Sequence, residues 1–77
     1  MDIQEYAQSV YDKYEAIHGG FPYGECLNIA KEIKQYFNVD IVGGLVGSGV
    51  EHWWVELNDG TIIDPMYQNE THRKIIF

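Results

Sequence analysis

The sequence predicts an α+β domain in which two N-terminal helices pack on a small antiparallel sheet of three to four strands. Hydrophobic residues follow the helical period through the first half of the chain, and β-branched and aromatic residues form short runs in the second half. Asn58-Asp59-Gly60 joins two of these runs as a hairpin. Helices that precede the strands, instead of alternating with them, are typical of α+β domains. The length of 77 residues indicates a single domain, residues 1–77.

The first predicted helix begins after Asp2 and ends before Gly19. Its apolar residues recur at intervals of three and four: Ile3, Tyr6, Ala7, Val10, Tyr14 and Ile17. Asp2 is followed three residues later by Glu5, a spacing that is typical of a capping box at a helix start. Gly19 and Gly20 end the helix, since glycine readily adopts the left-handed conformation that follows a last helical turn.

The second predicted helix covers about residues 25–37. One face of this helix is apolar and carries Cys26, Ile29, Ala30, Ile33 and Phe37. Pro22 lies in the preceding loop and prevents the helix from extending back toward the first one. Cys26 therefore falls in the first turn of the second helix.

Three runs after the second helix are predicted as strands: residues 39–46, 51–57 and 61–65. Residues 73–77 fit a short final strand. The glycine-rich segment 43–49 lacks the lysine-containing ending of a phosphate-binding loop, and no helix obviously follows it. We interpret it as a glycine-rich edge or loop near a site.

The loop between the second and third predicted strands has two possible registers with opposite consequences. A two-residue turn pairs Asn58 with Thr61 and turns Asp64 to the face opposite His52. A three-residue turn, with its glycine in the left-handed conformation, pairs Leu57 with Thr61. His52 and Asp64 are then diagonal neighbours on one face. Asn and Asp before Gly suit the three-residue turn, and we expect that register.

Composition and net charge limit the classes of function that this protein can have. A net charge of −7 and a pI of about 4.6 argue against binding to nucleic acid and are compatible with a basic peptide or protein partner. A single cysteine, Cys26, excludes an intramolecular disulfide and indicates a reducing compartment. The N-terminus lacks signal-peptide features, and no apolar run has the length of a membrane span. We expect a cytoplasmic protein without membrane association.

Cys26 is a candidate nucleophile because a cysteine reacts as its thiolate. The N–H groups and partial positive charge of a helix N-terminus stabilise that anion, although the neighbouring Glu25 opposes it. His52, as an imidazolium on the adjacent sheet, would supply the missing cation. Asp64 would accept the second ring N–H of His52 and fix its tautomer. Taken singly, a free cysteine on an apolar helix face or a strand histidine is more often structural; the combination points to catalysis.

Other polar residues have weaker assignments. His18 and His72 are expected at the surface. Tyr23, Asn28 and Trp54 are weak candidates for contacting substrate or an oxyanion. No cysteine or histidine pair has the spacing of zinc ligands, so we expect neither a metal nor a cofactor.

Three blocks of sequence carry a family resemblance. Residues 24–30 read GECLNIA, residues 52–57 read HWWVEL and residues 62–65 read IIDP. Over about residues 20–67, their order and spacing resemble those of transglutaminase-like cysteine enzymes, a part of the papain-like superfamily. The resemblance implies a minimal papain/transglutaminase-like core, an acyl-thioester on Cys26, His52 as base and Asp64 as orienter.

The expected function is that of a cysteine hydrolase or acyltransferase acting on an amide or thioester bond of a peptide or protein, as a peptidase, amidase or deamidase. The alternative is a non-catalytic acidic interaction or inhibitor module on the same scaffold, such as a phage-type counter-defence protein. Small size, acidic charge and the lack of a convincing oxyanion side chain favour the alternative. The three ordered blocks favour the enzyme.

Overall fold

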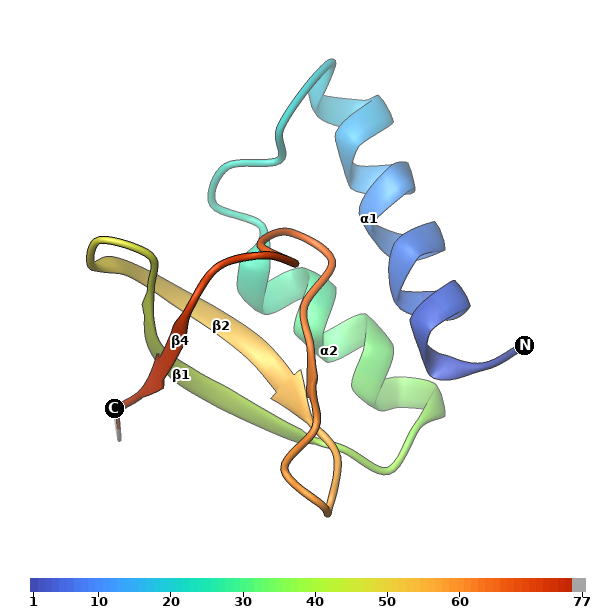
Figure 1. Ribbon diagram of the computed structural model, residues 1–77. Helices are drawn as coiled ribbons and strands as arrows, with labels where there is room; N and C mark the ends of the chain where they lie inside the picture. The colour runs from blue at the N-terminus through green and yellow to red at the C-terminus, as the bar shows by residue number, and fades with distance from the viewer. Residues whose placement is uncertain (76–77) are drawn as a thin grey trace.

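The computed structural model describes residues 1–75, which form an α+β fold with two helices and a four-stranded sheet (Figure 1). The elements are α1 (Ile3–His18), α2 (Cys26–Tyr36), β1 (Asp40–Val46), β2 (Val50–Glu56), β3 (Ile62–Ile63) and β4 (His72–Lys74). All neighbouring strands are antiparallel, and the sheet order is β3-β2-β1-β4. Helix α2 packs on β1 and β2, whereas α1 contacts α2 and β3. The predicted architecture of two helices on a sheet of three to four strands is confirmed.

The helix ends follow from local sequence. The Asp2 side chain accepts the Glu5 N–H at 2.8 Å and caps the start of α1. Gly19 ends α1 with a φ of 68°, the left-handed conformation that favours glycine. Helix α2 begins at Cys26 and ends at Tyr36, one residue inside the expected range at each end.

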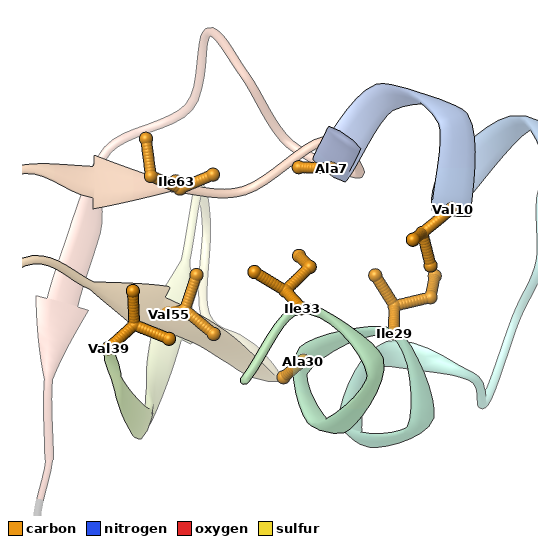
Figure 2. Packing of buried hydrophobic residues seen from close by; sticks show 8 residues of the cluster. All are labelled: Ala7, Val10, Ile29, Ala30, Ile33, Val39, Val55 and Ile63. Carbon is orange, nitrogen blue, oxygen red and sulfur yellow. The ribbon is translucent and has the colours of Figure 1, made fainter. Parts of the chain in front are cut away.

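The core lies between the two helices and the sheet. Ile29 and Ile33 of α2 lie between Val10 of α1 and Val55 of β2 (Figure 2). The whole cluster consists of Ala7, Val10, Ile29, Ala30, Ile33, Val39, Val55 and Ile63. Full burial of a large aliphatic side chain contributes about 1.5–3 kcal/mol, so this small cluster supplies much of the stability of a 77-residue chain.

The hairpin between β2 and β3 has the three-residue turn. The Leu57 N–H donates to the Thr61 carbonyl oxygen at 2.9 Å, and the Gly60 N–H donates to the Leu57 carbonyl oxygen at the same distance. Gly60 has a φ of 88°, which a glycine adopts without strain. The expected register is therefore confirmed.

This register decides which side chains share a face. Val55 lies opposite Ile63, and both belong to the core under the helices. Because side chains alternate along a strand, His52, Trp54 and Asp64 occupy the other face. All three are nevertheless buried.

The last strand is shorter than predicted and begins one residue earlier. Strand β4 pairs with β1, so it lies at the opposite edge of the sheet from β3. Ile76 and Phe77, the end of the predicted strand, lie outside the described residues. The first part of the glycine-rich segment is the middle of β1, and only its end forms the turn to β2.

Gly44 lies at the most crowded point of β1. It is opposite His52 on one neighbouring strand and Lys74 on the other. A Cβ atom here would overlap the Arg73 carbonyl oxygen and the Trp54 ring. The glycine therefore permits a close approach of β4 and Trp54, which explains its place within a strand.

Gly44→Ala is expected to lower the free energy of unfolding by about 3 kcal/mol and the melting temperature by roughly 10–20 °C, because the methyl group displaces β4 backbone. Thermal denaturation measures the loss, and hydrogen exchange reports whether β4 amides lose protection. Val50→Ala, at a half-exposed position of β2, is the control with little expected change. If Gly44→Ala has the melting temperature of the wild type and its β4 amides stay protected, β4 does not approach Gly44 as closely as described.

Candidate active site

Cys26 is the first residue of α2 and is half-buried. Glu25 occupies the N-cap but makes no side-chain hydrogen bond to the helix. Its carboxylate instead contacts the His18 ring at 3.0 Å and the Asn28 amide at 2.8 Å. The first N–H groups of α2 therefore receive no cap from Glu25 and can stabilise negative charge on the Cys26 sulfur. The ion pair with His18 also reduces the opposition that Glu25 offers to a thiolate.

His52 and Asp64 are joined inside the protein. His52 Nε2 lies 2.9 Å from Asp64 Oδ2, and the two residues are only 3% and 8% exposed. Asp64 Oδ1 accepts the Met66 N–H at 3.1 Å, which fixes the carboxylate. Because Nε2 carries the proton donated to Asp64, Nδ1 is the ring nitrogen that remains for Cys26. The expected contact of His52 with Asp64 on one sheet face is confirmed.

The surroundings of Cys26 favour its thiolate. A hydrogen bond with His52 lowers the pKa of Cys26; partial burial opposes this, and a backbone hydrogen bond from Trp53 lowers the pKa further. Strand β3 pairs only with Val55 and Glu56, so the Trp53 backbone lies beyond the end of β3. The shortness of β3 thus leaves room for the start of α2 at this edge of β2.

The His52 ring is stabilised as an imidazolium. Burial alone lowers the pKa of His52, but hydrogen bonds with Asp64 and Cys26 outweigh burial and raise it to about 9. Burial also raises the pKa of Asp64, whereas its bonds with His52 and His72 lower it, and the lowering dominates. These shifts favour the thiolate of Cys26, the imidazolium of His52 and the carboxylate of Asp64 more than in the same groups free in water.

We expect NMR titration of the His52 ring to show a midpoint near pH 9 instead of the unperturbed 6.5. The sign follows from the raised pKa: the ring stays protonated at neutral pH and loses its proton only as the pH rises through about 9. A His52 midpoint at or below 6.5 would contradict the ion-paired arrangement.

The three weak candidates lie in different surroundings. Tyr23 is 77% exposed. The Asn28 side-chain amide donates a hydrogen bond to the Glu25 carboxylate. Trp54 is buried, and its indole N–H donates to Glu56 at 3.2 Å. The indole N–H is thus already engaged, and the backbone N–H groups at the start of α2 are the better candidates for contacting an oxyanion.

The expectation for His72 is wrong, while that for His18 is confirmed. His18 lies at the surface and contacts Glu25. The His72 side chain is only 6% exposed, and its Nε2 lies 2.7 Å from Asp64 Oδ2. Pairing of β4 with β1 brings His72 to this position. No local pattern in the sequence indicates a contact between segments so far apart.

Tyr67 is a second residue that the sequence did not reveal. Its ring meets the His52 ring edge-on at 4.7 Å between centroids, and it packs on Phe21 at 5.5 Å. Phe21 in turn packs on Tyr23 at 4.7 Å. These aromatic rings form a continuous row from the exposed Tyr23 to the buried His52.

The spaces beside Cys26 and beside Asp64 differ in size. The gap that Cys26 lines, together with core residues, measures about 10 Å³, hardly enough for one water molecule. This gap is therefore too small to admit a substrate. A cavity of about 480 Å³ lies beside Asp64 and His72 and is also lined by Tyr67 and Glu70. Cys26 does not line this cavity.

Comparison of the chain with protein-family models, with curated proteins and with solved structures found no match. Within residues 1–75, neither helix combines the length and the apolar character that a membrane crossing requires. In the same part of the chain, no group of three or more His, Cys, Asp or Glu residues is arranged to hold a metal ion.

Proposed function

We propose that this protein is a cysteine hydrolase or acyltransferase of the transglutaminase-like kind, acting on an amide or thioester bond of a peptide or protein. The observation that carries the proposal is the buried His52–Asp64 hydrogen bond of 2.9 Å. It is supported by the position of Cys26 at the start of α2 and by the influence of His52, which lowers the pKa of Cys26. A nucleophile, a base and a residue that orients the base are the groups that covalent acyl transfer requires.

The first half of the reaction follows from this arrangement. The Cys26 thiolate attacks the carbonyl carbon, and a tetrahedral oxyanion forms next to the first N–H groups of α2. The His52 imidazolium gives its Nδ1 proton to the leaving nitrogen or sulfur as the bond to carbon breaks. The products are a free amine or thiol and an acyl-thioester on Cys26.

The second half regenerates the thiolate. Neutral His52 takes a proton from water or from an acceptor amine, which attacks the thioester carbon. The bond to sulfur breaks, and the acyl group leaves as an acid or as a new amide. Asp64 keeps the His52 ring oriented throughout and stabilises its charged form.

The proposal is tested by searching for the acyl-thioester. Wild-type protein incubated with a panel of short acyl thioesters and activated peptide esters is expected to gain one acyl mass on Cys26 by intact mass spectrometry. Cys26→Ala should fold normally, because alanine is the best helix former, and should gain no mass. Asp64→Asn should accumulate the adduct more slowly, because a misoriented base slows acylation. Absence of any adduct from wild type across the panel would count against catalysis.

A non-catalytic acidic binding module is the second candidate. The small gap at Cys26 favours this function. A net charge of −7 suits a basic partner. A partner that binds Cys26→Ala as tightly as wild type, together with no acyl adduct on wild type, would favour the module over the enzyme.

A further inference from the structure

We propose that His72 is a positioning residue of the candidate active site, which holds the Asp64 carboxylate in the orientation that His52 requires. This inference rests on the proposed function. His72 Nε2 lies 2.7 Å from Asp64 Oδ2, the same oxygen that His52 Nε2 contacts at 2.9 Å. One carboxylate oxygen thus accepts a hydrogen bond from each of two nearly inaccessible rings, with 2% and 6% of their side chains exposed.

The fold fixes the His72 ring on several sides. Its residue pairs with Val46 where β4 meets β1. The ring meets Trp54 edge-on, with 4.8 Å between centroids. Its Nδ1 lies 3.0 Å from the Glu70 carbonyl oxygen. A ring held by backbone, indole and carboxylate together has little freedom to rotate, so it can in turn fix Asp64.

Both ring nitrogens of His72 face oxygen acceptors, the Asp64 carboxylate at Nε2 and the Glu70 carbonyl oxygen at Nδ1. An ionised carboxylate only accepts hydrogen bonds, so the His72 ring is the donor in its bond to Asp64. Removal of the ring would leave this buried carboxylate oxygen with one partner fewer, a loss that a buried polar group tolerates poorly.

Two further ionisable residues of the described part of the chain share a cavity with His72. Tyr67 and Glu70 line the same cavity as His72 and Asp64. The neighbours on the packed strands, Val46 and Trp54, carry no ionisable group. A change at His72 is therefore expected to act directly on Asp64 and, through Asp64, on His52.

The cavity beside His72, about 480 Å³, makes a direct test possible. Imidazole is small enough to enter it and to occupy the space that His72→Ala vacates. We expect His72→Ala to slow alkylation of Cys26 by iodoacetamide at about pH 6, below the free-thiol pKa of about 8.5, because Asp64 no longer orients His52. The expected loss is about tenfold, a usual effect when a hydrogen-bond partner behind a site residue is removed. Added imidazole should restore the rate in a saturable manner.

Controls separate positioning from stability. Arg73→Ala alters the neighbouring exposed side chain of β4 and should keep the wild-type rate, and imidazole should leave wild type unchanged. If His72→Ala does not fold, His72→Gln, which keeps an N–H donor, should fold and show a smaller loss of the alkylation rate.

Two outcomes would contradict the inference. A His72 variant that melts at a lower temperature but keeps the wild-type pH profile of alkylation would overturn the inference and leave the proposed function standing. A wild-type thiol without activation at pH 6 would overturn both.

Discussion

Asp64→Asn is expected to lower the free energy of unfolding by about 3–5 kcal/mol, the usual loss when one partner of a buried ion pair is removed. Asp64 Oδ2 accepts hydrogen bonds from two histidine rings, and its side chain is only 3% exposed. An asparagine keeps one acceptor oxygen but removes the negative charge that both rings contact. Its amide hydrogens would also face ring N–H donors, so buried groups would lose their partners.

Urea denaturation near neutral pH measures this effect. Asp59→Asn is the matched control, because Asp59 is an exposed turn residue whose oxygen accepts the Thr61 N–H, and asparagine keeps that acceptor. We expect the control to change stability by less than about 0.5 kcal/mol. An Asp64→Asn protein as stable as Asp59→Asn would show that Asp64 does not hold the two histidine rings by hydrogen bonds.

His52→Ala is expected to slow alkylation of Cys26 at about pH 6 by at least about tenfold, because an ordinary thiol has a pKa of about 8.5 and is almost fully protonated there. The substitution removes the hydrogen bond and the cation that lower the pKa of Cys26. The measurement is the iodoacetamide rate as a function of pH. The wild-type rate should rise at a lower pH than the variant rate.

The control for this prediction is His18→Ala, which removes a histidine from the surface. It frees Glu25 from its ion pair, so a small slowing of about twofold is expected from the released negative charge. If the His18 and His52 substitutions slow alkylation equally, the reactivity of Cys26 depends on the net charge around it and not on a specific contact with His52. If His52→Ala does not slow alkylation, His52 does not activate Cys26.

Local sequence signals were sufficient for much of the fold and for the contact between His52 and Asp64. The Asp2 cap, the glycine after α1 and the helical face of α2 were predicted from spacing alone. The most informative signal was the three-residue turn at Gly60, since its register places His52 and Asp64 on one face. A turn type is encoded by a few adjacent residues, so sequence reasoning can reach it.

Two of the unpredicted features, at His72 and Gly44, depend on the pairing of strands that are far apart in the sequence. His72 reaches Asp64 only because β4 pairs with β1, and a three-residue strand carries no clear sequence signal. Gly44 allows that pairing, but a glycine run predicts a loop as readily as a crowded strand. Trp54 follows His52 by two residues and was assigned to the substrate side; it is instead buried and bonded to Glu56.

Whether the fold activates Cys26 can be tested without any substrate, by comparing the thiol reactivity of folded and unfolded wild-type protein. Because the chain has one cysteine, iodoacetamide labelling reports on Cys26 alone. At about pH 6, the folded protein should label at least about tenfold faster than the same protein in urea, since an unfolded thiol titrates near 8.5. Slower labelling of the folded protein, or equal labelling in both states, would contradict an activated nucleophile.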